Sequence, residues 1–161
     1  IVIAGWIGQP LIMRTSRGGA LFSLASVFVG PPSLFCGALV ALCGHLGTLW
    51  CYSALGDSWR IGVMRDEKTT LVTHGPYRLV RHPIYLFQFM ILVGMLVLLP
   101  SLFSILILFI HFICVILKSF DEERHLAAIH DCKYHDYLLR TGGFFPRWKS
   151  ILLVLGIRKK S

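Results

Sequence analysis

Residues Thr73 to Tyr85, which read T-H-G-P-Y-R-L-V-R-H-P-I-Y, form a polar stretch between two long apolar regions. Eight of these thirteen positions are Arg, His, Tyr or Pro, two of each, and more than thirty residues with almost no charge follow. Polar groups held at the edge of a bilayer cost free energy unless they are paired or build a site. We therefore expect this stretch to form part of a functional site at a membrane boundary.

The composition is that of a membrane protein. The 161 residues are 55% hydrophobic with a mean hydropathy of +0.69, which is too apolar for an ordinary soluble domain. We expect one domain over residues 1–161, and an N-terminus that has been trimmed, because the chain starts without Met. The net charge of +8 lies beside apolar spans, where Lys and Arg meet lipid headgroups, so no nucleic-acid partner is expected. The five Cys contain no CxxC pair, which favours neither disulfides nor a zinc site.

The apolar regions predict membrane-spanning helices. Ser33–Tyr52 alone reaches the ~20 residues needed to cross a bilayer, and Gly30-Pro31-Pro32 breaks the chain before it. Pro100-Ser101 divides the second region, Ile84–Leu117. As one helix this region would extend ~51 Å, well beyond a ~30 Å hydrocarbon core, so a helical hairpin over about 84–118 is predicted.

A hairpin returns the chain to the side of the membrane on which it started. Gly56–Pro83 and Lys118–Ser161 then share one face, and these two segments carry most of the Lys and Arg. Because cytoplasmic loops are enriched in these residues, we expect that face to be cytosolic. The fold class is therefore an all-α, polytopic integral-membrane helical bundle. Asp121–Leu139 adds a cytosolic amphipathic helix that Thr141-Gly142-Gly143 ends.

The hairpin brings the acidic residues after the last apolar stretch toward Arg81-His82. Lys118 and Glu122 are four apart and share a helix face, which allows either a salt bridge at the membrane edge or a substrate and cofactor site. Pro83 suits the first turn of a helix, whose free N–H groups, with His82, are expected to form an anion site. The alternative is that the Arg and Tyr of this stretch only anchor the chain at the membrane interface.

Two His lie inside apolar runs, His45 and His111. A neutral His that is hydrogen-bonded between helices is the commoner arrangement, and a haem pair is the alternative. Glu122-x-x-His125 has the spacing of di-iron bundles, but no second copy of that motif is present. No metal site is therefore expected.

Several motifs in order resemble one family. They are L-V-T-H-G-P-Y-R-L-V-R-H-P-I-Y, the E-E-x-x-L of Glu122–Leu126, the Y-x-x-Y of Tyr134–Tyr137 and the closing T-G-G-F-F-P. Together they cover about Leu55–Pro146 and resemble the isoprenylcysteine carboxyl methyltransferase-like and phospholipid methyltransferase-like integral membrane methyltransferases.

The resemblance implies a cytosol-facing pocket for S-adenosylmethionine, with S-adenosylhomocysteine as product, built from 56–85 and 118–146. A lipophilic substrate would reach it from the bilayer. Lys118 falls where the family often has an Arg that faces the substrate, and His130-Asp131 replaces an aromatic–Gly pair. The residues implied to line the cofactor are Thr69, Thr70, Leu71, Val72, Tyr77, His82, Pro83, Ile84, Tyr85 and Glu122.

Methyl transfer depends on positioning and on exclusion of water. A carboxylate acceptor needs a cation such as Lys118 or Arg81 to hold it, whereas an amine acceptor needs a base such as Glu123 or His125. Carboxyl methylation of an isoprenylcysteine is the leading hypothesis, and phospholipid N-methylation is the alternative. An NADPH-dependent sterol reductase and a non-catalytic haem protein are the rivals from other classes. The sequence does not define the oligomeric state.

Overall fold

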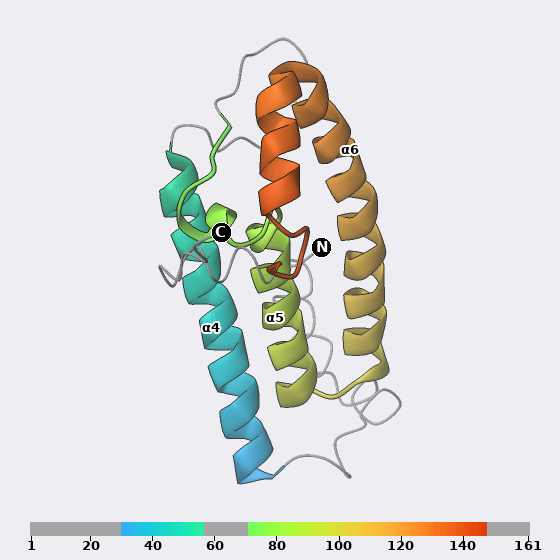
Figure 1. Cartoon of the computed structure of the whole chain (residues 1–161). Coiled ribbons are helices and arrows are strands. Elements are labelled where there is room, and N and C mark those ends of the chain that lie inside the picture. The colour runs from blue at the N-terminus through green and yellow to red at the C-terminus, as the bar shows by residue number, and fades with distance from the viewer. Residues whose placement is uncertain (1–29, 57–70, 148–161) are drawn as a thin grey trace. The chain divides into compact units, whose positions relative to one another are not determined.

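A computed structural model describes residues 30–56 and 71–147 of the chain. These residues form helices α4 (Pro31–Leu55), α5 (Pro83–Leu98) and α6 (Leu102–Arg140), with a short 3-10 helix, η2, at Gly75–Arg78 (Figure 1). The described residues form no β-strand, although Val80 and Gly142 form an isolated β-bridge. The all-helical fold class predicted from the sequence is confirmed over these ranges.

The described residues divide into two compact units, one with residues 30–46 and 86–116 and the other with residues 47–56, 71–85 and 117–147. Among the described residues, two helices are long and apolar enough to cross a membrane: α4, with 25 residues, and the first 29 residues of α6, Leu102–His130. Only 28% and 22% of their most apolar windows are buried inside the protein. Apolar faces this large are unfavourable in water and are typical of helices solvated by lipid.

Small residues let α4 and α5 approach closely in the first unit (Figure 1). A Cβ placed on Gly94 of α5 would lie 2.6 Å from the backbone nitrogen of Ala41 and 2.7 Å from the carbonyl oxygen of Gly37, both on α4. A Cβ on Gly44 would meet the backbone of α5 in the same way. Close backbone approach through small residues is the usual basis of helix packing in lipid, where hydrophobic burial gives no drive.

A tight connection joins α5 to α6 in the same unit. Pro100 lies between the two helices, where the sequence predicts the tip of the hairpin. Ser101 caps α6, because its Oγ accepts a hydrogen bond of 3.1 Å from the backbone N–H of Ser104. The rings of Phe89 and Phe112 lie 6.3 Å apart, which shows that the two helices pack against each other after the turn.

The two intramembrane His differ in their surroundings. His45 Nδ1 lies 2.7 Å from the carbonyl oxygen of Ala41, one turn earlier on α4. His111 is buried, and its Nε2 has no hydrogen-bond partner among the described residues. These surroundings do not test the haem alternative, which stays a hypothesis.

In the second unit α6 folds back on itself. The predicted helix Asp121–Leu139 is the second half of this longer element, which ends at Arg140 directly before Thr141. Arg81 bonds to both Glu123 and the carbonyl of Thr141, which are eighteen positions apart (141 − 123). A straight helix of that length would separate them by about 27 Å. The helix must therefore reverse between them, as Figure 1 shows.

Candidate active site

The Gly-Pro turn positions Tyr77. Gly75 has a φ of +59°, a conformation that favours glycine, and it opens η2. Pro76 and Tyr77 are both buried in this short helix. The hydroxyl of Tyr137 donates a hydrogen bond of 2.6 Å to the carbonyl of Tyr77, which ties the turn to the end of α6. Burial raises the pKa values of both Tyr77 and Tyr137, so both phenols stay neutral near pH 7.

Pro83 is the first residue of α5, as predicted from its missing N–H. His82, directly before it, has a side chain that is only 5% exposed. Its ring lies 5.9 Å from that of Tyr85 with an interplanar angle of 21°. The start of α5 thus carries a buried imidazole next to a phenol, both in the second unit.

Glu123 joins the two residues before Pro83. Its Oε1 accepts a hydrogen bond of 2.9 Å from Nε of Arg81 and lies 3.0 Å from Nε2 of His82. The Arg81 side chain is 14% exposed and that of Glu123 is 28% exposed, so the pair is partly shielded from solvent. Charge-assisted hydrogen bonds of this kind are stronger than neutral ones. With Nε2 donating to Glu123, the imidazole orientation is fixed from α6.

Glu122 lies near the other nitrogen of the same imidazole. The hydroxyl of Tyr85 donates to Oε1 of Glu122, and Oε2 lies 3.6 Å from Nδ1 of His82. Glu122 and Glu123 contribute two negative charges and Arg81 one positive charge, which leaves one net negative charge when His82 is neutral. The cluster therefore suits a cationic ligand group better than an anionic one.

The structure differs in one detail from the anion site predicted at the first turn of α5. The anions that His82 meets are the protein's own carboxylates rather than an open position for a ligand. The reason is the return of the chain from α5 to α6, which brings the acidic segment of α6 within reach of the Arg-His pair. Sequence topology predicts this proximity, but not the pairing of individual atoms.

Tyr134 lies close to this cluster, one turn of α6 before Tyr137. It is 1% exposed, and its hydroxyl has no hydrogen-bond partner among the described residues. Burial, together with the nearby charge of Glu123, raises the pKa of Tyr134 to about 12. A cavity of about 420 Å³ borders this part of α6 and is lined by Ala127, Cys132, Tyr134, His135, Asp136 and Leu138.

The other predicted residues are placed as follows. Lys118 is exposed and forms no ion pair with Glu122 within the described ranges, so the salt bridge considered from sequence is not formed there. Leu71 and Val72 are half-buried in the segment before η2, and Ile84 is half-buried in α5. Thr69 and Thr70 lie outside the described residues.

Three residues near the cluster were not among the predicted site residues: Tyr134, Thr141 and Phe144. The ring of Phe144 lies 5.5 Å from that of His82, and the Thr141 carbonyl accepts from Arg81. In the sequence they fall within the Y-x-x-Y and T-G-G-F-F-P motifs, and Thr141 also opens the segment predicted to end the amphipathic helix.

The family model described as phospholipid methyltransferase matches residues 32–132, which include Arg81, His82, Tyr85 and both carboxylates of the cluster. The chain belongs to the phospholipid methyltransferase family. It is also similar to the nickel-cobalt-cadmium resistance protein NccN of Alcaligenes xylosoxydans xylosoxydans, with 35% identity over 111 residues. That alignment covers 69% of this chain and 48% of NccN.

A second relative is also named as a metal resistance protein. The cobalt-zinc-cadmium resistance protein CzcN of Cupriavidus metallidurans (strain ATCC 43123 / DSM 2839 / NBRC 102507 / CH34) is 33% identical over 123 residues. The alignment covers 74% of this chain and 52% of CzcN. The chain thus spans about half the length of these two relatives.

Proposed function

We propose that the protein transfers a methyl group from S-adenosylmethionine to a lipophilic acceptor in the membrane. Membership of the phospholipid methyltransferase family and the lipid-exposed apolar helices support methyl transfer at a membrane. The observation that carries the proposal is the cluster of Arg81, His82 and Tyr85 with Glu122 and Glu123, all inside the matched range.

The chemistry of this cluster fits S-adenosylmethionine. That molecule carries ribose hydroxyls and an amino group as donors, and a sulfonium as a cation. Glu122 offers a carboxylate that is 29% exposed and has no Arg or Lys partner among the described residues. We assign Tyr77, His82–Tyr85 and Glu122 to holding the cofactor, with Thr69–Val72 as further binding residues. When bound, the cofactor supplies an activated methyl group.

Within this proposal Arg81 and Glu123 position other groups. The guanidinium of Arg81 bonds to Glu123 and to the carbonyl of Thr141, and Glu123 also holds His82. These bonds occupy both side chains, so we propose positioning roles for Arg81 and Glu123 in place of the catalytic roles that the sequence suggests. Of the two cations that the sequence suggests for holding an acceptor, we assign this role to Lys118, which is exposed one turn before Glu122.

Two acceptor classes have separate support. A carboxylate acceptor of the isoprenylcysteine type is favoured by the exposed ammonium of Lys118. An amine acceptor, such as the ethanolamine headgroup of a phospholipid, is favoured by the net negative charge of the cluster and by the family. Methyl-labelled cofactor, supplied with farnesylcysteine or with phosphatidylethanolamine vesicles, separates them by which product carries the label.

The names of the two relatives suggest a setting for this activity. Both are named as metal resistance proteins, yet the described residues contain no group of three or more His, Cys, Asp or Glu that could hold a metal ion. We therefore propose that any role in metal resistance acts through methylation of a membrane component. A Glu122→Ala strain that keeps full cobalt tolerance, compared with a deletion strain that loses it, would refute this link.

Calorimetry of the detergent-purified protein tests the proposed function itself. We expect S-adenosylhomocysteine to bind and NADPH and haem not to bind. Binding of NADPH without binding of S-adenosylhomocysteine would overturn the assignment in favour of a reductase. Binding of haem alone would favour the non-catalytic alternative.

A further inference from the structure

The loop after α6 is held firmly against the start of α5. The backbone N–H of Arg81 donates to the carbonyls of Gly142 and Gly143, over 2.8 and 3.1 Å, and the N–H of His82 donates to Gly143 over 3.2 Å. The Nη1 of Arg81 also donates to the carbonyl of Thr141 over 2.7 Å. These four hydrogen bonds, all within the second unit, fix the loop directly beside His82.

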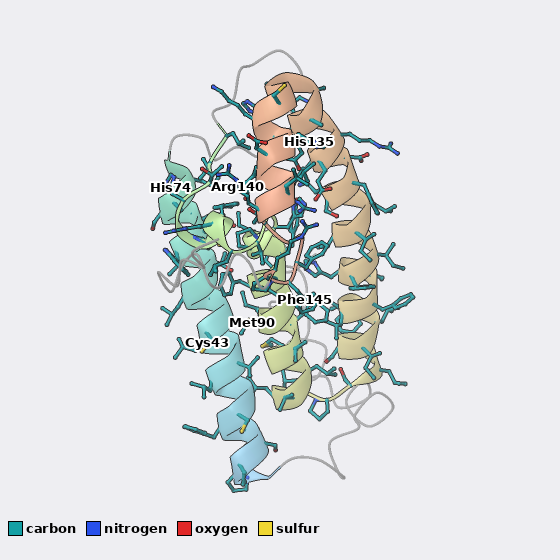
Figure 2. The ribbon with its side chains drawn as sticks, viewed as in Figure 1. Cys43, His74, Met90, His135, Arg140 and Phe145 are labelled. Atoms are coloured by element: carbon teal, nitrogen blue, oxygen red, sulfur yellow. The ribbon has the colours of Figure 1, made fainter. Side chains whose placement is uncertain are left out.

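A sharp bend in this loop gives two consecutive Phe different surroundings. A Cβ on Gly142 would overlap the carbonyl of Phe145, so the bend requires glycine. The ring of Phe144 is half-buried and lies 5.5 Å from the imidazole of His82, at an angle of 34°. Phe145, labelled in Figure 2, is 79% exposed. Phe144 therefore belongs to the cluster, and Phe145 serves as its natural control.

The surroundings of His82 combine aromatic rings with a carboxylate. Tyr85 and Phe144 both pack near the imidazole, and Glu122 lies 3.6 Å from its Nδ1. The guanidinium of Arg81 pairs with Glu123, which leaves Glu122 as the carboxylate without an Arg or Lys partner in the described ranges. Aromatic faces grouped with an anionic group form a recurrent binding site for organic cations such as quaternary ammonium and sulfonium ions.

We propose that Phe144 supplies an aromatic face of the site for the sulfonium group of the methyl donor, with Glu122 as the accompanying anion. This inference rests on the proposed function, because it concerns how that cofactor is recognised. Attraction between a ring and a cation depends on the positive charge of the ligand. S-Adenosylmethionine carries that charge at sulfur, whereas S-adenosylhomocysteine is a neutral thioether of nearly the same shape. The two ligands therefore report the charge-dependent part of binding.

The test compares the dissociation constants of both ligands by calorimetry, for the full chain in detergent. Phe144→Leu removes the ring and keeps the apolar volume. We expect it to weaken S-adenosylmethionine binding by about two- to thirty-fold and to leave S-adenosylhomocysteine binding close to that of the wild type. Phe145→Leu is the matched control and should change neither constant. Melting temperatures of both variants report whether the fold is retained.

Each outcome of this experiment decides the inference. Equal weakening of both ligands by Phe144→Leu, or no weakening, would overturn it while leaving the proposed function in place. Failure of the wild type to bind either ligand would instead overturn the proposed function. If Phe144→Leu does not fold, Phe144→Trp gives the answer, because indole attracts cations more strongly than phenyl. We then expect a greater preference for S-adenosylmethionine than in the wild type, and an unchanged or smaller preference would refute the inference.

Discussion

Arg81 and Glu123 form a hydrogen-bonded ion pair, Nε to Oε1 at 2.9 Å, across 42 positions of sequence. The pair joins the residue before the His-Pro turn to the acidic segment of α6, and Glu123 holds His82 by the same oxygen. Removal of the carboxylate leaves two partly buried donors without their acceptor, which is costlier than removal of an exposed charge.

Glu123→Ala should therefore destabilise the protein more than Lys118→Ala does. We expect a loss of about 1–3 kcal/mol for Glu123→Ala, from the two unsatisfied donors, and a loss within about 0.5 kcal/mol for the exposed Lys118. Melting followed by tryptophan fluorescence in detergent measures both. Equal melting temperatures for the two variants would show that the ion pair contributes nothing to the second unit.

Ligand binding should separate the two residues that share a face of α6. Glu122→Ala is expected to abolish binding of S-adenosylmethionine, because it removes the carboxylate assigned to the cofactor and to its sulfonium group. Lys118→Ala should leave that affinity unchanged and reduce turnover at least tenfold, because Lys118 is assigned to the acceptor. Calorimetry and a methyl-transfer assay give the two readouts. Wild-type affinity in Glu122→Ala would show that this division of roles is wrong.

Much of this arrangement follows from sequence. Pro83 and Pro100 mark the start of α5 and the turn that follows it, because proline fits a first turn and interrupts a helix. The proximity of Arg81-His82 to the acidic segment also follows, since a hairpin returns the chain to one side. The partners of the individual carboxylates do not follow, because topology does not fix the rotation of α6 about its axis. The reversal of α6 after Glu123 does not follow either.

That reversal carries no signal in the sequence. Between Glu123 and Thr141 there is neither Gly nor Pro, so the pattern predicts an uninterrupted helix. Tertiary contacts therefore hold the bend. The main ones are the hydrogen bonds from Arg81 to Glu123 and Thr141 and the hydrogen bond from Tyr137 to Tyr77. Tyr134 and Phe144 come close to the cluster through these contacts. Both residues fall within sequence motifs, and Tyr134 also follows the helical spacing of Asp121–Leu139, but neither pattern predicts a position beside the cluster.

The two Tyr of the Y-x-x-Y motif should respond oppositely to loss of their hydroxyls. Tyr137 donates to the Tyr77 carbonyl over 2.6 Å, whereas the Tyr134 hydroxyl is buried without a partner within the described residues. Tyr137→Phe should cost about 1–2 kcal/mol of folding free energy, and Tyr134→Phe should be neutral or stabilising. Thermal melting of both variants at pH 7 checks this. A marked loss in Tyr134→Phe would reveal a bonded water or ligand at that hydroxyl.

The pH dependence of Tyr134 gives a separate prediction. Its pKa is raised from 10.0 to about 12, so the folded state favours the neutral phenol. The unfolded chain releases this proton near pH 10, and the stability that the neutral form contributes is present below that pH and is lost as pH rises toward 12. Tyr134→Phe lacks this loss and should gain stability relative to the wild type between pH 10 and 12. Parallel denaturation curves over that range would contradict the raised pKa.

Packing in the first unit should depend on Gly94. A side chain there meets the backbone of α4, with 2.6 Å from its Cβ to the nitrogen of Ala41, and backbone cannot move aside as a flexible side chain does. Gly94→Val should therefore force α4 and α5 apart and cost about 3 kcal/mol or more. Gly30→Ala is the control, since the nearest atom to its Cβ is Pro32 Cδ at 3.7 Å, and should cost little. The two variants are compared by their melting temperatures in detergent and by the yield of folded protein. If Gly94→Val melts like Gly30→Ala, the close approach of α4 and α5 is not what holds this unit together.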